Sequence, residues 1–139
     1  MTLTPQVFVV EFHPQIRAAV DPGRMQRLLN DAGGGRIGLT GVRELVIGVP
    51  DIEREIERWQ ALLEPAPTLG DRHWQLPSGP AIRLESSSGL CGRLICEVKD
   101  IDAAAAFLRE QELLGNSTDD ELHIAPAALA GLDLRLVPA

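Results

Sequence analysis

The chain has 139 residues, 45% of them apolar, and its 20 acidic and 13 basic residues give a net charge of −7. This length fits one ordinary domain, and this apolar content is typical of a globular protein rather than a disordered one. The negative charge argues against a nucleic acid or an anionic membrane as partner, because both bind basic surfaces. No segment reads as a transmembrane or secretory sequence, so we predict a cytoplasmic location.

Residues 1–38 form an N-terminal region in which we predict one strand and one short helix. The strand is "QVFVVEF", residues 6–12, and the helix lies in "DPGRMQRLLNDAGGG", residues 21–35. Asp21 is suited to cap the start of this helix, and Gly33 to end it. The helical residues that we expect to face the core are Met25, Leu28 and Leu29.

Residues 39–139 contain an internal repeat. "ELVIGVPDIEREIERW" from Glu44 aligns with "RLICEVKDIDAAAAFL" from Arg93, at an offset of 49 residues. "HWQLPSGPAIRLE" from His73 corresponds to "HIAPAALAGLDLRLV" from His123, which sets Arg83 opposite Arg135. We therefore predict two modules, residues 39–87 and 88–139.

Each module begins with an alternating strand that runs into a helix. In the first module Leu45, Ile47 and Val49 share one strand face, and Asp51 is placed to cap the helix. The helix then carries an apolar stripe at helical spacing, made of Ile52, Ile56, Trp59 and Leu63. In the second module the cap is Asp100 and the stripe is Ile101, Ala104, Ala105 and Leu108. Short strands follow each helix, so the unit is β-α-β-β with room for one more strand.

The strand, the Val-x-Asp-Ile turn and the helix, repeated in tandem, resemble the vicinal oxygen chelate superfamily. That superfamily includes glyoxalase I, extradiol dioxygenases and bleomycin-resistance proteins, and the resemblance is to its glyoxalase-like domains. It rests on "LVIGVPDIEREIERWQALL", "ICEVKDIDAAAAFL" and the closing strands "AIRLE" and "DLRLV". The resemblance implies an α+β fold of paired βαβββ modules whose curved mixed sheets surround a cavity, with the N-terminal strand and short helix as additions.

The resemblance also indicates four positions that face the cavity, namely Glu44, Arg83, Arg93 and Arg135. Metal-using members of the superfamily place metal ligands there. Arginine has hydrogen-bond donors only and a permanent positive charge, so three arginines and one glutamate are a poor ligand set. We therefore predict no metal and no other cofactor.

Two interpretations of these arginines are open. In the first interpretation, the arginines form an anion site that holds a carboxylate or phosphate, and Glu44 orients one of the arginines. Alternatively they belong to an internal ion-pair network with acids on the same strand faces, namely Glu44, Glu85, Glu97 and Asp133. Four acids against three arginines favour the network, because buried charges are normally paired.

His73 and His123 occupy matching places in the two modules. Together with Glu44 they are the candidate catalytic residues, since histidine exchanges protons near neutral pH. The alternative, which we favour from the sequence, is that both are strand residues pointing to solvent. Cys91 and Cys96 lie five residues apart in one strand, so they point to opposite faces and are not expected to pair.

Three functions remain open at this point. The first is a metal-independent protein that binds a small, anionic molecule. The second is a lyase or isomerase that uses histidine and glutamate as acid and base. The third is an interaction module. We expect a homodimer, and the N-terminal strand either closes a preceding pair of modules or is exchanged between subunits.

Overall fold

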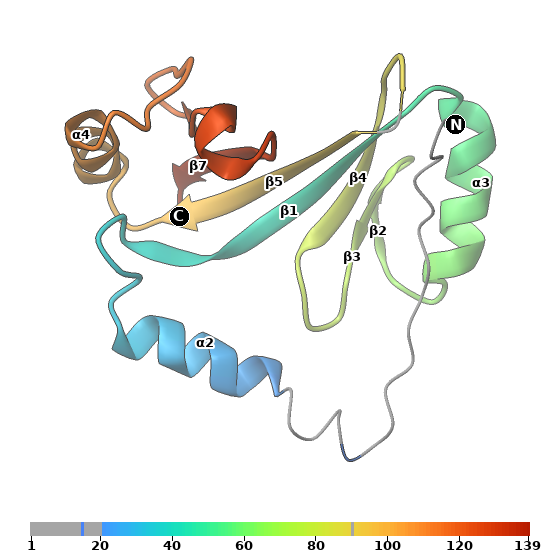
Figure 1. Ribbon diagram of the computed structural model, residues 1–139. Coiled ribbons are helices and arrows are strands. Elements are labelled where there is room, and N and C mark those ends of the chain that lie inside the picture. The colour runs from blue at the N-terminus through green and yellow to red at the C-terminus, as the bar shows by residue number, and fades with distance from the viewer. Residues whose placement is uncertain (1–14, 16–20, 90) are drawn as a thin grey trace.

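The computed structural model describes residues 15, 21–89 and 91–139 (Figure 1). The predicted strand at residues 6–12 lies outside this part of the chain. The helices are α2 (Pro22–Asp31), α3 (Ile52–Leu63), α4 (Ile101–Glu110) and the 3-10 helix η1 (Pro126–Leu129). The strands are β1 (Leu39–Val49), β2 (Thr68–Gly70), β3 (His73–Gln75), β4 (Ala81–Ser86), β5 (Cys91–Val98), β6 (Leu122–His123) and β7 (Asp133–Pro138).

The strands form one continuous mixed sheet in the order β2-β3-β4-β1-β5-β7-β6. The long antiparallel pair β1 and β5 joins the two repeats, and within each repeat the first and last strands are parallel. The first repeat is βαβββ. In the second repeat the isolated bridge between Leu114 and Ile124 stands where a third short strand would be. The two sheets expected from the sequence are therefore joined edge to edge into one.

The register of the sheet shows the internal symmetry directly. Glu44 pairs with Ile95, and Val46 pairs with Arg93, so each pair maps onto the other under the offset seen in the sequence. On the outer strands His73 pairs with Arg83, and His123 pairs with Arg135 at the matching place.

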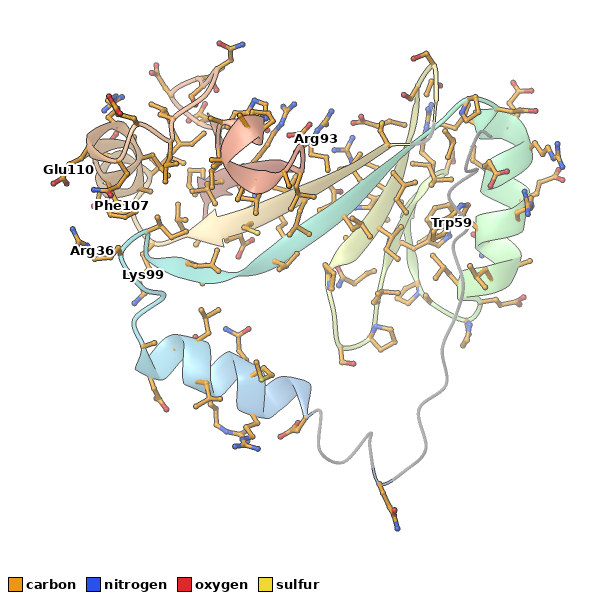
Figure 2. The ribbon with its side chains drawn as sticks, viewed as in Figure 1. Arg36, Trp59, Arg93, Lys99, Phe107 and Glu110 are labelled. Carbon is orange, nitrogen blue, oxygen red and sulfur yellow. The ribbon has the colours of Figure 1, made fainter. Side chains whose placement is uncertain are left out.

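Helices α3 and α4 cover one side of the sheet, which we call the helix-covered face. Under α3, Trp59 packs with Trp74 and Leu84, and Figure 2 shows Trp59 pointing from the helix toward the strands. Under α4, Val98 and Leu136 pack with the helix stripe predicted from the sequence. These apolar side chains lie on one side because strand residues alternate between faces.

The two helix starts are as predicted. The side chain of Asp51 accepts a hydrogen bond from the backbone N–H of Arg54, and that of Asp100 accepts one from Ala103 at 2.9 Å. Each carboxylate satisfies a free N–H group and lies at the positive end of the helix dipole. The same local chemistry therefore begins both helices.

Helix α2 packs less closely than expected. Asp21 caps it as predicted, but Met25 is 60% exposed and Leu28 is 52% exposed. The prediction that these two residues face the core is wrong, because α2 contacts the beginning of β1 and leaves its own apolar side open. Leu29 is half-buried and lines a groove of about 350 Å³ between α2 and β1, together with Val42.

The link from α2 to β1 is fixed to the second repeat. The Lys99 side chain donates to the carbonyl of Gly33 at 3.3 Å, and the Arg36 guanidinium lies 5.1 Å from the centre of the Phe107 ring (Figure 2). Gly34 has a φ of +77°, and a Cβ there would lie 2.1 Å from the carbonyl oxygen of Leu39. The glycine run therefore ends the helix, as predicted, and turns the chain toward β1.

Candidate functional site

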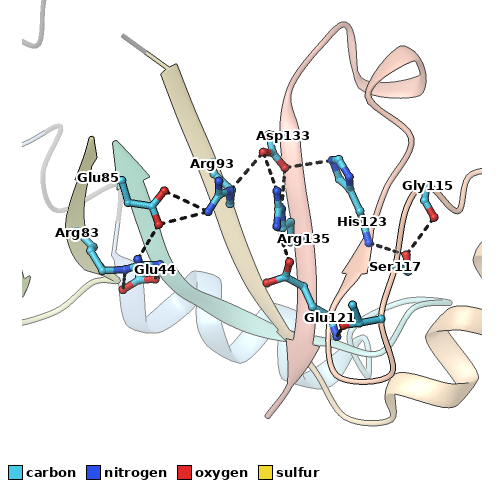
Figure 3. Close-up of polar contacts among 11 residues, drawn as sticks. Glu44, Arg83, Glu85, Arg93, Gly115, Ser117, Glu121, His123, Asp133 and Arg135 are labelled. Atoms are coloured by element: carbon cyan, nitrogen blue, oxygen red, sulfur yellow. Dashed lines mark hydrogen bonds and ion pairs between the residues drawn. The ribbon is translucent and has the colours of Figure 1, made fainter. Parts of the chain in front are cut away.

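The candidate residues from the sequence lie together on the side of the sheet opposite the helices. Figure 3 shows this charged face, with α2 behind the strands. It carries the six predicted residues Glu44, His73, Arg83, Arg93, His123 and Arg135. They come from six strands and are brought to one side by the period-two alternation along each strand.

Glu44 and Arg83 form the first pair of the network. Glu44 is only 7% exposed, and its two carboxylate oxygens accept from Arg83 Nε at 3.1 Å and Nη2 at 3.0 Å. Arg83 Nη1 also donates to Glu85 at 2.7 Å. Hydrogen bonding to Glu44 raises the pKa of Arg83 above its usual value, against the opposing effect of burial. This two-point contact fixes the plane of the guanidinium.

Arg93 occupies the middle of the network, between the two repeats (Figure 3). Its Nη1 lies 3.4 Å from Glu85 Oε2, and its Nε donates to Asp133 Oδ2 at 3.3 Å. Its Nη2 makes no hydrogen bond within the described part of the chain. A guanidinium has five N–H donors, and the two on Arg93 Nη2 are therefore not used by carboxylates in this part of the chain.

Arg135 forms the matching pair in the second repeat. Its Nε donates to Asp133 Oδ1 at 3.1 Å, and its Nη1 donates to Glu121. Burial acts to raise the pKa of Asp133, but hydrogen bonds from Arg135 and Arg93 outweigh it and hold that pKa below its usual value. Hydrogen bonding to Asp133 correspondingly raises the pKa of Arg135.

The two histidines point into this network. His73 Nε2 lies 2.8 Å from Glu44 Oε1, and His123 Nε2 lies 3.1 Å from Asp133 Oδ1. Both nitrogens are buried, yet neither contact has the alignment of a hydrogen bond and neither nitrogen has another partner in the described residues. The favoured prediction that both histidines point to solvent is therefore wrong. The pairing of β3 with β4 and of β6 with β7 sets each imidazole beside an arginine.

The network contains four carboxylates and three guanidinium groups. Three of the four acids expected from the sequence belong to it, while Glu97 pairs with Arg43 at 2.6 Å instead. The fourth acid is Glu121, which sequence reasoning missed. The signal for it was the spacing Glu121-x-His123, which sets both on one strand face. The formal charge of the network is about −1 with neutral histidines and about +1 with both protonated.

The four positions that the resemblance assigns to metal ligands do not fit a metal. Three of them are arginines that already bond to carboxylates, and a guanidinium offers no lone pair to a cation. Among residues 15, 21–89 and 91–139, no group of three or more His, Cys, Asp or Glu side chains is placed to hold a metal ion.

An apolar floor lies between the charged side chains. Val46, Ile95 and Val137 form a buried cluster, and by strand register Val46 lies between Arg83 and Arg93. The charged face therefore consists of guanidinium and carboxylate groups around aliphatic side chains. Such a surface can bind the polar end of a small molecule and contact its hydrocarbon part.

Comparison with known proteins identifies the fold. No family model matches the sequence, and no curated protein matches it. Methylmalonyl-CoA epimerase from Mycobacterium tuberculosis aligns with a TM-score of 0.58 and 22% identity, over 73% of this chain and 89% of that one. A methylmalonyl-CoA epimerase in complex with methylmalonyl-CoA aligns with a TM-score of 0.55 and 13% identity, over 73% and 95%.

A hypothetical protein from Bacillus halodurans C-125 also aligns, with a TM-score of 0.56 and 12% identity, over 70% of this chain and 93% of that one. These alignments confirm the predicted α+β fold. At these identities the likeness shows the fold alone. No helix in the described part of the chain is long and apolar enough to cross a membrane.

Proposed function

We propose that this protein binds a small monocarboxylate on the charged face, without a metal ion, and that Arg93 makes the central contact. The observation that carries this proposal is the unused Nη2 of Arg93 between the two repeats. A planar guanidinium can donate to a ligand carboxylate from Nη2 while Nε and Nη1 keep their contacts to Asp133 and Glu85, which a single lysine ammonium group would not reproduce.

The charge of the network limits how much negative charge a ligand can carry. Four carboxylates against three guanidinium groups give a formal charge of about −1 when the histidines are neutral. A doubly charged phosphate would meet net repulsion in such a site, and this repulsion grows as the site excludes water. One carboxylate on an otherwise uncharged molecule meets the least repulsion while still engaging Arg93.

The neighbouring acids hold the arginines in place for a ligand. Glu85 bridges Arg83 and Arg93, and Asp133 bridges Arg93 and Arg135. The three arginine side chains remain between 25% and 33% exposed, so solvent and small solutes reach them. Because the guanidinium groups are already ordered, ligand binding costs less side-chain entropy than it would with mobile arginine side chains.

The test is a titration of the protein with benzoate, butyrate and inorganic phosphate, followed by amide and guanidinium chemical shifts in nuclear magnetic resonance spectra. We expect the carboxylates to shift signals from β1, β4, β5 and β7, and phosphate to bind more weakly. Arg93→Lys keeps the charge and removes the planar guanidinium with its unused Nη2, so it should weaken benzoate binding by about tenfold or more.

Arg58→Lys is the matched control, because Arg58 pairs with Glu55 on α3, away from the charged face. We expect this variant to bind as the unsubstituted protein does. Equal binding by the Arg93→Lys variant would overturn the assignment of Arg93. Absence of carboxylate binding by the unsubstituted protein would overturn the proposed function.

A second candidate function is an isomerase. Each repeat brings one imidazole to a carboxylate, His73 to Glu44 and His123 to Asp133, and such pairs suit proton transfer. Two proteins of the same fold are methylmalonyl-CoA epimerases. The test is incubation with methylmalonyl-CoA in heavy water, where turnover would incorporate deuterium and His73→Gln would abolish it. No incorporation above the uncatalysed rate would exclude this substrate.

A further inference from the structure

We propose that His73 and His123 determine the ligand charge that the site accepts, so that carboxylate binding strengthens as the pH falls and both imidazoles gain a proton. This inference rests on the proposed function and adds two specificity-determining residues to it. Neither histidine needs to touch the ligand, because each acts on an arginine through a shared carboxylate oxygen.

The same three-atom arrangement occurs once in each repeat. Glu44 Oε1 lies 3.1 Å from Arg83 Nε and 2.8 Å from His73 Nε2. Asp133 Oδ1 lies 3.1 Å from Arg135 Nε and 3.1 Å from His123 Nε2. An arginine and an imidazole therefore lie against a single oxygen at two symmetry-related places.

Protonation adds a positive charge beside each shared oxygen. An imidazolium attracts the carboxylate, which then neutralises the neighbouring arginine less completely. The network as a whole therefore becomes more positive around Arg93, where the ligand carboxylate is proposed to bind.

The charges around each imidazole come from few elements. His73 on β3 faces Glu44 of β1 and Arg83 of β4, and its other neighbour β2 carries no charged residue. His123 on β6 faces Asp133 and Arg135 of β7, with Glu121 two residues before it. Protonation of both rings takes the formal charge of the network from about −1 to about +1.

The test is to measure the dissociation constant of benzoate at about pH 8 and about pH 5.5, a range in which histidine is the side chain that ordinarily changes charge. The variants are the double substitution His73→Gln with His123→Gln, and Arg58→Lys as the control, because Arg58 pairs with Glu55 on α3, away from the charged face. The imidazole proton and nitrogen signals in nuclear magnetic resonance spectra at each pH report directly whether the rings gain a proton.

In the unsubstituted protein and in the Arg58→Lys control we expect benzoate to bind at least about tenfold more tightly at the lower pH, because ligand and proton binding are linked. The double variant should have nearly the same dissociation constant at both pH values. Equal binding at both pH values in the unsubstituted protein would overturn this inference and leave the proposed function standing. Imidazoles that stay neutral at the lower pH would also overturn it. Absence of benzoate binding at either pH would overturn the proposed function, and this inference with it.

Discussion

The two faces of the sheet are made by the same strands and have opposite character. On the helix-covered face Leu84, Val98 and Leu136 are almost fully buried against α3 and α4. On the charged face, the arginines alternate with these residues along β4, β5 and β7 and stay partly open to solvent. Alternation along a strand thus lets one segment contribute to the core and to the candidate site.

The difference indicates where the stability of the fold comes from. Burying a large apolar side chain contributes about 1.5–3 kcal/mol, whereas a partly exposed ion pair contributes about 0–1 kcal/mol. The charged face therefore contributes little to the free energy of unfolding, although it holds many side chains in fixed positions. Substitutions on the two faces should separate stability from binding.

The largest loss of stability is expected for Trp74→Ala on the helix-covered face. Trp74 is fully buried, and its Nε1 donates to Gln60 Oε1 at 2.7 Å. Removing the indole leaves a cavity and an unpaired amide, so the free energy of unfolding should fall by about 3–5 kcal/mol. Urea denaturation would measure this loss. Leu69→Ala, at an exposed position on β2, is the control and should change it by less than about 0.5 kcal/mol. A small effect of Trp74→Ala would mean that α3 contributes little to the core.

The next effect is expected for Glu44→Gln on the charged face. The substitution keeps the shape of a buried side chain and removes the charge that pairs with Arg83. It leaves a partly buried guanidinium without its main partner, and the free energy of unfolding should fall by about 1–3 kcal/mol. Chemical denaturation checks this, with Glu97→Gln as the control, because the Glu97 pair with Arg43 is more exposed. Equal losses in both variants would show that burial of Glu44 is not what makes its charge important.

The fold was predictable because local signals repeat. Asp51 and Asp100 gave the helix starts, and the alternation around Ile47 and Cys96 gave the buried strand faces. The position of α2 was not predictable. The pattern of Met25 and Leu28 indicates that one side of the helix is apolar, but it does not indicate which part of the protein, if any, covers that side. The predicted homodimer and cytoplasmic location stay predictions.

The membership of the candidate site was partly predictable. The resemblance, with which the strand alternation agrees, placed Glu44, Arg83, Arg93 and Arg135 on one face, as the structure has them. The partners of these residues were not predictable, because they depend on which strands are neighbours in the sheet. From the sequence we predicted that Glu97 belongs to the network and that both histidines point to solvent. Strand register instead brings in Glu121 and points His73 at Glu44.

Acid should weaken the charged face before the helix-covered face. The pKa of Asp133 is held below its ordinary value of 3.8 in the folded chain, mainly by Arg135 and Arg93 against the effect of burial. A group with a lowered pKa stabilises the fold above the pKa of the unfolded chain, and this stabilisation is lost as the pH falls below 3.8 toward the folded value. Asp133→Asn should therefore lower the free energy of unfolding near neutral pH by about 1 kcal/mol and flatten its decline in acid. Denaturation at a series of pH values measures both, and an equally steep decline in the variant would assign the acid sensitivity to other carboxylates.

The smallest effect is expected for Arg58→Ala on the outer surface of α3. Arg58 Nη1 lies 2.8 Å from Glu55 Oε1, a distance as short as those in the network, but the Arg58 side chain is 65% exposed. Water and salt screen such a pair, so its loss should change the free energy of unfolding by no more than about 0.5 kcal/mol. Thermal and chemical denaturation check this, and repeating them at high salt should remove the remaining difference. Contact distances alone do not distinguish this ion pair from the Glu44 pair. A loss of unfolding free energy as large as that in Glu44→Gln would therefore show that burial does not set the strength of ion pairs in this protein.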